Sequence, residues 1–151
     1  MRKVRCFLWL GLLAALPLGA AVRTPAVFGD SMVLQRNRPL PVWGWAEPGE
    51  AVKVTLGEST AETVADASGR WRVTLPARPE GGPCELTVAG ENTLRFKDVM
   101  IGEVWLCSGQ SNMAWRLNQS EGAEQAIRDS ANPRLRLFQV ERHWGQVAPE
   151  Q

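Results

Sequence analysis

The chain has 151 residues and a formal net charge of +1, and beyond residue 21 its basic residues are scattered singly. This length suits one or two small domains. A near-neutral chain lacks the basic patch that nucleic acid would require, so no nucleic-acid partner is expected. A metal site is not indicated, because the sequence has one histidine and no clustered ligands. Glycine-rich phosphate loops are absent too, so no cofactor is predicted.

Residues 1–21 have the pattern of a secretory signal peptide. The positive start, Arg2, Lys3 and Arg5, precedes an apolar stretch over residues 7–16 and small residues at 19–21. About ten apolar residues at about 1.5 Å each do not span a hydrocarbon core of ~30 Å, although a retained anchor is the alternative. We expect export to a periplasm or the outside and no membrane contact after cleavage. Removing these residues would change the net charge to −2, since three cations leave a chain of +1.

Residues 25–97 carry short runs in which apolar and polar residues alternate. Such runs lie at residues 52–56, 71–75 and 85–88, and turn residues at 47–50, 66–69 and 89–92 separate them. Period-two patterning with one apolar face predicts half-buried antiparallel strands. Several short strands at this spacing predict a jelly-roll-like β-sandwich domain.

Three tryptophans of this region, Trp43, Trp45 and Trp71, allow two interpretations. Aromatic faces suit the apolar faces of pyranose rings, so they could stack on sugar. Alternatively they fill the sandwich core, where Trp brings a large buried area. We favour core packing, given the ordinary burial preference of aromatic residues.

The apolar run at residues 104–107 is followed by Gly109, Gln110, Ser111 and Asn112. A buried strand that breaks at a glycine and then presents a serine is one way to mount a nucleophile. The N–H groups that follow would begin a helix and point toward an anion formed there. The alternative is an ordinary turn in which Ser111 or Asn112 caps the helix.

Several stretches in one order resemble the sialate O-acetylesterase family, a group of SGNH serine hydrolases. The first is VMIGEVWLCSGQSNM at residues 99–113, which resembles the family's nucleophile block. The others resemble its amino-terminal β domain: DSMVLQR at 30–36, PVWGWAEPGE at 41–50, DASGRW at 66–71 and GGP at 81–83. The resemblance implies a β-sandwich domain over residues 25–97. It also implies the incomplete start of an α/β/α, flavodoxin-like SGNH hydrolase domain over residues 98–151.

The resemblance also implies a chemistry. Ser111 would be the nucleophile of an esterase that removes O-acetyl groups from sialic acid or related sugars through an acetyl-enzyme. Its backbone N–H would contribute to the oxyanion hole, and Gly109, Gln110 and Asn112 would support the turn. Two alternatives remain, an acetylxylan-type esterase and a non-catalytic carbohydrate-binding or interaction module. The oligomeric state is not specified by any of them.

The family's base and its orienting aspartate lie in a late Asp-x-x-His block that this sequence does not contain. Its members are longer, so the chain resembles their amino-terminal part, and we expect this fragment alone to be inactive. His143 is not part of such a block, because Val140 occupies the position three residues before it, where the block has aspartate. We expect it to be a surface or substrate-lining residue. Gly122 and Asn132 have the residue types of further oxyanion donors but sit in no recognisable block.

Beyond residue 113 we expect a helix-rich stretch and then a strand at residues 135–140, held more loosely than the β domain. Cys84 and Cys107 could pair in an exported protein, but we favour buried structural thiols. The tripeptide Gly29-Asp30-Ser31 matches the start of the nucleophile block in other SGNH hydrolases. No buried strand precedes it, so we assign it to the β domain.

Overall fold

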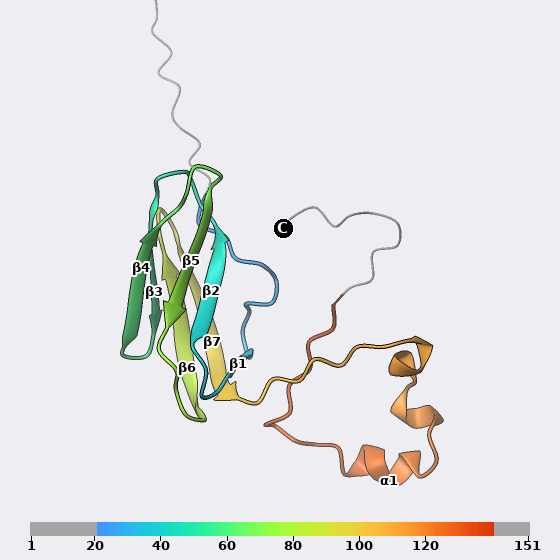
Figure 1. Ribbon diagram of the computed structural model, residues 1–151. Coiled ribbons are helices and arrows are strands. Elements are labelled where there is room, and N and C mark those ends of the chain that lie inside the picture. The colour runs from blue at the N-terminus through green and yellow to red at the C-terminus, as the bar shows by residue number, and fades with distance from the viewer. Residues whose placement is uncertain (1–20, 141–151) are drawn as a thin grey trace, which may run out of the picture.

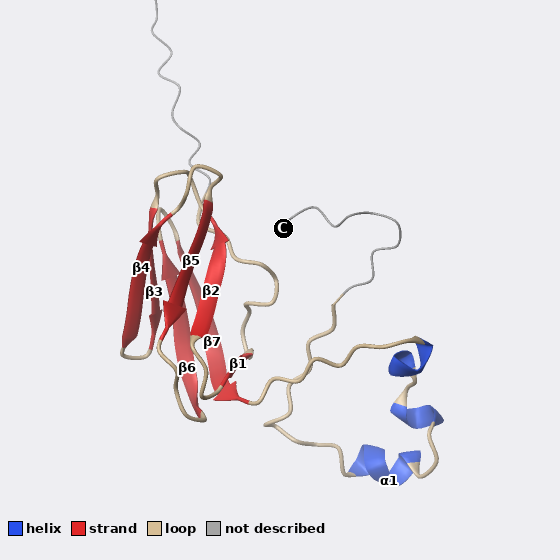
Figure 2. Ribbon diagram, in the orientation of Figure 1, coloured by secondary structure: helices blue, strands red, loops and turns tan. Residues whose placement is uncertain are grey.

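The structure is a computed structural model that describes residues 21–140. Within that range the chain is mostly β-strand, with short helices confined to its last part (Figures 1 and 2). The strands are β1 (Val33–Gln35), β2 (Leu40–Trp45), β3 (Ala51–Leu56), β4 (Ser59–Val64), β5 (Arg70–Leu75), β6 (Gly81–Ala89) and β7 (Thr93–Gly102). The 3-10 helices η1 (Ser111–Ala114) and η2 (Leu117–Gln119) and the helix α1 (Ala123–Arg128) follow.

The strands form two sheets. Five strands lie in the order β1-β7-β6-β3-β4, and β2 pairs with β5 in the second sheet. All neighbours are antiparallel except β1 and β7, which run parallel with Val33 beside Met100 and Gln35 beside Gly102. We call residues 22–102, which hold both sheets, the β module.

Both sheets contribute to one hydrophobic core. The predicted alternation is confirmed in β3 and β5, where every second residue is buried. The same holds at Leu86 and Val88 of β6. The fully buried side chains of the core are Val22, Leu40, Val42, Val52, Val54, Leu56, Leu75, Leu86, Val88 and Val99. The expected β-strand character of residues 25–97 is therefore confirmed.

The tryptophans divide between the two interpretations. Trp71 is buried in the core, as expected, whereas Trp43 is 39% exposed and Trp45 is half-buried. Trp43 and Trp45 alternate with buried Val42 and Gly44, so they lie on the outer face of β2. The prediction of core packing is wrong for Trp43. Its ring instead contacts Phe28 edge-on, with 4.8 Å between centroids.

The chain beyond β7 differs from the sequence prediction. β7 continues past residue 97 to Gly102, so the five-stranded sheet extends beyond the expected end of the β domain. Residues 104–107 and 135–140 are not strands, although their apolar runs predicted them. A strand needs a neighbour to pair its N–H and C=O groups. Within the described part of the chain neither segment has a strand alongside it.

Residues 103–140, which we call the Ser111 segment, bury little surface. All of them are exposed except the half-buried Ala123 and Arg136. The expected helix-rich stretch consists of η1, η2 and α1, which contain no buried residue. Figure 1 shows this segment leaving the end of β7, passing through the short helices and returning toward the sheets. Among the described residues no helix has the length and apolar character needed to cross a membrane.

Gly44 provides a test of how closely the start of the β module packs on β2 and β5. A Cβ at this position would lie 1.9 Å from the Arg23 carbonyl oxygen and 2.9 Å from the Trp71 ring. Arg23 forms an isolated bridge to Trp45, so this backbone cannot move away freely. We expect Gly44→Ala to lower the free energy of unfolding by about 3 kcal/mol in urea titrations, the upper range for overpacking.

Gly29→Ala is the matched control, because a Cβ there meets nothing within 4 Å. It should leave the urea midpoint close to that of the parent chain. Equal midpoints for the two variants would contradict the close approach at Gly44.

Candidate active site

Ser111 is the first residue of η1 in the Ser111 segment. The turn is held by its own backbone, since the Met113 N–H donates to the Gln110 carbonyl at 2.9 Å. A Cβ at Gly109 would lie 2.7 Å from Met113 Cγ, so a larger residue there would displace this exposed side chain. The expected order of buried strand, turn and helix is therefore replaced by an exposed extended run and a single 3-10 turn.

The partners that would complete a catalytic site are not assembled around Ser111 in residues 21–140. Ser111 is exposed, and its hydroxyl has no hydrogen-bond partner among these residues. His143 lies outside the described residues. Gly122 adopts a left-handed conformation before α1, and the Asn132 side chain accepts a hydrogen bond from the Arg134 N–H. Both thus have local roles, and the roles of Ser111, Gln110 and Asn112 in catalysis stay predictions.

The Ser111 segment is joined to the β module at its start. The Arg36 guanidinium contacts Glu103 at 2.6 Å and Glu80 at 2.7 Å. Gln35 donates to Glu103 at 3.0 Å and accepts the Val104 N–H at 3.0 Å. The hydrogen bond from Gln35, with Arg36 beside it, lowers the pKa of the Glu103 carboxyl from its ordinary value. The hydrogen bond from Arg36 lowers the pKa of Glu80 in the same way.

A second junction lies toward the end of the segment. The Ser31 hydroxyl donates to Asp98 at 2.8 Å, and Arg136 Nη2 lies 3.0 Å from the other carboxylate oxygen. Arg136 Nη1 also donates to the Asp98 carbonyl. The hydrogen bond from Ser31, followed by that from Arg136, lowers the pKa of Asp98. Sequence reasoning missed these pairs because contacts between residues 38 to 69 positions apart leave no mark in a single sequence. Only the shared resemblance of residues 30–36 and 99–113 hinted at them.

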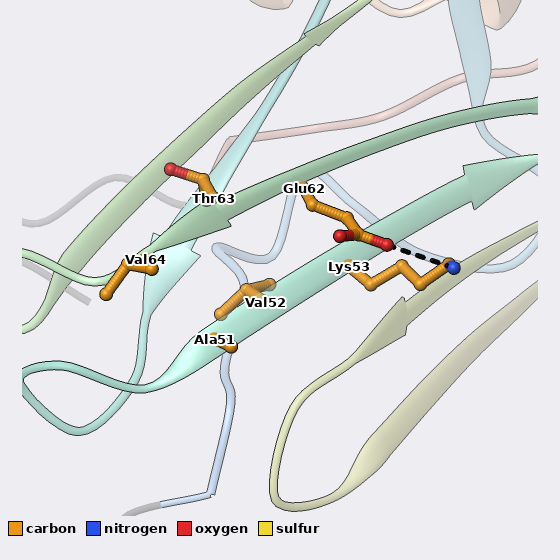
Figure 3. A pocket seen from close by; sticks show the side chains of 6 residues that line it. All are labelled: Ala51, Val52, Lys53, Glu62, Thr63 and Val64. Atoms are coloured by element: carbon orange, nitrogen blue, oxygen red, sulfur yellow. Dashed lines mark ion pairs between the residues drawn. The ribbon is translucent and has the colours of Figure 1, made fainter.

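A hollow of about 430 Å³ lies over β3 and β4 (Figure 3). Its lining residues are Ala51, Val52, Lys53, Glu62, Thr63 and Val64. Figure 3 shows the Lys53 and Glu62 side chains directed toward each other, with 3.0 Å between Nζ and Oε1. This ion pair satisfies both charges, and the lining holds no pair of nucleophile and base. The hollow is therefore not the candidate active site.

The two described cysteines are both free thiols. Cys84 is half-buried and donates to the Val99 carbonyl at 3.3 Å, and burial raises the pKa of its thiol. Cys107 is exposed, so the expectation of a buried structural thiol is wrong at this position. The reason is the missing strand at residues 104–107, which leaves the whole run in solvent.

The comparison with solved structures identifies the class of protein. The chain is similar to a carbohydrate acetylesterase from Xanthomonas citri, with a TM-score of 0.68 and 44% identity. The match covers 71% of this chain and 25% of that one. The resemblance to an esterase is thus confirmed. No family model matches the chain.

The similarity to curated proteins is more specific than the similarity to the solved structure. The chain is 37% identical over 135 residues to the sialate O-acetylesterase of Mus musculus, and 37% identical over 125 residues to that of Homo sapiens. The matches cover 81% and 75% of this chain. It spans about a quarter of the length of these relatives, 25% and 24%. The chain is therefore homologous to sialate O-acetylesterases over most of its length.

The different settings of the two thiols lead to a prediction about reactivity. Thiolate is the reactive form, so an exposed thiol reacts faster than one whose pKa is raised by burial. We expect a maleimide at neutral pH to modify Cys107 at least about ten times faster than Cys84. Peptide mapping by mass spectrometry would follow each site separately.

Cys107→Ser should remove the fast reaction, whereas Cys84→Ser should leave it unchanged. Modification of Cys84 at the rate of Cys107 would contradict the half-buried position of Cys84.

Proposed function

We propose that this chain is the amino-terminal part of a serine esterase that removes O-acetyl groups from sugars, with sialic acid as the first candidate. The observation that carries the proposal is its 37% identity over 135 residues to a sialate O-acetylesterase. The likeness to a carbohydrate acetylesterase at 44% identity supports the same class of substrate. An exported enzyme, with residues 1–21 as its signal peptide, would meet such sugars outside the cytoplasm.

The proposed reaction has two halves. Ser111 Oγ attacks the acetyl carbonyl while its proton passes to a base, and the sugar hydroxyl leaves with a proton from that base. Water then attacks the acetyl-enzyme, releasing acetate and restoring the serine. The Ser111 backbone N–H would stabilise the oxyanion, and loss of one such donor typically costs ~10²–10³ in rate. The base and the orienting aspartate would come from residues beyond those described.

Part of the proposal concerns the fold. The β module would be a jelly-roll-like sandwich, and residues 98–151 would begin an SGNH hydrolase domain. The shared core of the two sheets supports the first point. The sequence likeness at residues 99–113 supports the second. So does the exposure of eleven large apolar side chains in residues 104–140, such as Trp105 at 83% and Leu106 at 91%.

The nucleophile is tested by labelling the complete enzyme that carries this segment with a fluorophosphonate. We expect the adduct on Ser111, and Ser111→Ala should lower turnover of an aryl acetate by at least about 10³-fold, because nothing else supplies the attacking oxygen. Ser108→Ala is the matched control, since Ser108 is exposed in the same segment. It should keep both label and turnover.

An adduct on Ser31, or full activity of the Ser111→Ala enzyme, would contradict the assignment. Cleavage of acetylated xylan in preference to O-acetylated sialic acid would instead favour an acetylxylan-type esterase. That result would keep the same nucleophile.

A second candidate function is sugar binding by the β module itself. Trp43 is exposed on the outer face of β2, and Arg72 of β5 lies directly opposite it in the register. A partly exposed aromatic side chain beside a cation suits an acidic sugar, which would contact the ring while its carboxylate meets the guanidinium. This function needs no catalytic residue.

We expect Trp43→Ala to weaken binding of a sialylated oligosaccharide to the chain about tenfold, the equivalent of about 1.4 kcal/mol. Isothermal titration would measure the affinity. Val64→Ala, which removes another exposed apolar side chain, is the control and should change nothing. Equal affinity in the parent chain and Trp43→Ala would exclude this surface as the sugar site.

A further inference from the structure

We propose that the β module positions the Ser111 segment through two polar anchors, one at each end of it. The exit anchor consists of Gln35, Arg36, Glu80 and Glu103. The return anchor consists of Ser31, Asp98 and Arg136. The proposal rests on the proposed function for the role of Ser111, and it makes these side chains positioning residues of the esterase site.

The exit anchor fixes the direction in which the chain leaves β7. The planar Arg36 guanidinium contacts Glu103 through Nε at 2.6 Å and Glu80 through Nη1 at 2.7 Å. The Arg36 N–H donates to the Gly102 carbonyl at 2.8 Å. Because the guanidinium is rigid, these bonds define one orientation of Glu103 relative to the module.

Gln35 extends this control one residue further. Its amide nitrogen donates to Glu103 Oε2 at 3.0 Å, and its oxygen accepts the Val104 N–H at 3.0 Å. One side chain of β1 therefore holds both the side chain of Glu103 and the backbone of Val104. Hydrogen exchange of the Val104 amide therefore reports directly on whether this hydrogen bond of the exit anchor is formed.

The return anchor binds the segment after its excursion through η1, η2 and α1. One carboxylate oxygen of Asp98 accepts a hydrogen bond from Ser31 at 2.8 Å, and the other accepts one from Arg136 at 3.0 Å. The carboxylate therefore joins two different parts of the chain. Ser31 and Asp98 have φ of 61° and 56°, a left-handed conformation that costs energy in non-glycine residues. The hydrogen bond from Ser31 to Asp98 offsets that cost and holds the Asp98 carboxylate in position to bind Arg136.

Burial distinguishes Arg136 of the return anchor from most of the segment, whereas Glu103 of the exit anchor is exposed. From residue 103 to residue 140 only Ala123 and Arg136 are not exposed, and the Arg136 side chain is 20% exposed. A nucleophile must be held within a fraction of an ångström of its productive position. In residues 21–140 burial does not tie the Ser111 segment to the module, whereas the polar contacts at its two ends do.

The alternative is that these are ordinary surface ion pairs, which contribute about 0–1 kcal/mol each. The anchors differ from isolated pairs because each arginine makes more than one bond, and the Glu103 and Asp98 carboxylates each bind two partners. Lys53 and Glu62 form an isolated pair on β3 and β4 and therefore provide the matched comparison.

Amide hydrogen exchange of the 151-residue chain, followed by NMR, tests the proposal. We expect Arg36→Met to lower protection of the Val104 amide about tenfold. Arg136→Met should have the same effect on the Leu135 amide, which donates to the Asn132 carbonyl next to the return anchor. Amides of β3 and β6 should keep their protection, which establishes that the module stays folded. Lys53→Met should change neither reporter, and Arg36→Lys should retain part of the Val104 protection.

A pH series adds a readout that loss of general stability would not produce. The pKa values of Glu103, Glu80 and Asp98 are lowered in the folded chain. Their contribution is therefore fully present above the ordinary carboxyl pKa of ~4 and is lost as the pH falls through the folded values. Protection of Val104 should fall below about pH 4 in the parent chain, and the fall should be smaller in Arg36→Met, where the hydrogen bond from Gln35 alone still lowers the pKa of Glu103.

Protection of Val104 and Leu135 that is equal in the parent, the anchor variants and Lys53→Met would overturn the proposal. The complete enzyme gives a second arm, in which Arg36→Met should lower kcat about tenfold with KM unchanged, because the anchor does not touch substrate. Loss of protection with unchanged kcat would overturn the positioning role. An active Ser111→Ala enzyme would instead overturn the proposed function while leaving the exchange results intact.

Discussion

The structure depends on the parallel pairing of β1 with the end of β7. This pairing places Val33 beside Met100 and Gln35 beside Gly102, so a strand from the start of the chain closes the edge of the five-stranded sheet. Val99 and Ile101 of β7 are buried in the core and cannot shift along the strand without exposing apolar surface. The register that the core fixes therefore also decides which side chains of residues 30–36 meet residues 98–104. Every polar contact at the exit of the Ser111 segment follows from that register.

The same constraint explains why the two halves of the chain differ so much in burial. In the β module, alternating strands close a core between two sheets, and the hydrophobic effect contributes roughly 25 cal/mol for each Å² of apolar surface removed from water. The Ser111 segment has comparable apolar side chains, including Trp105, Leu106 and Phe138, but they are exposed. Its position relative to the module rests on hydrogen bonds and ion pairs at residues 98, 103 and 136. A segment held in this way depends on pH and on single charges far more than a packed strand does.

Sequence reasoning succeeded where local pattern and packing agree. The alternation in residues 52–56 and 71–75 predicted β3 and β5, because a strand with one buried face needs that period whatever lies around it. It failed where tertiary pairing decides the outcome. The run at residues 104–107 is as apolar as a buried strand, but it has no neighbour in the described chain and stays extended in solvent. The prediction for Trp43 failed for a related reason. Which alternate residues of β2 face the core depends on its pairing with β5, and that pairing directs Val42 inward and Trp43 outward.

Two similar tripeptides, at residues 29–31 and 109–111, show how context separates a structural serine from a candidate nucleophile. The Ser31 hydroxyl donates a hydrogen bond to Asp98, and Asp98 also binds Arg136. These bonds lower the pKa of Asp98, so this carboxylate is a poor general base and does not activate the Ser31 oxygen. Ser111 is exposed, and its hydroxyl has no hydrogen-bond partner among residues 21–140. The chemistry of its neighbours, more than the tripeptide itself, therefore argues against Ser31 as a nucleophile, whereas the catalytic role of Ser111 stays a prediction.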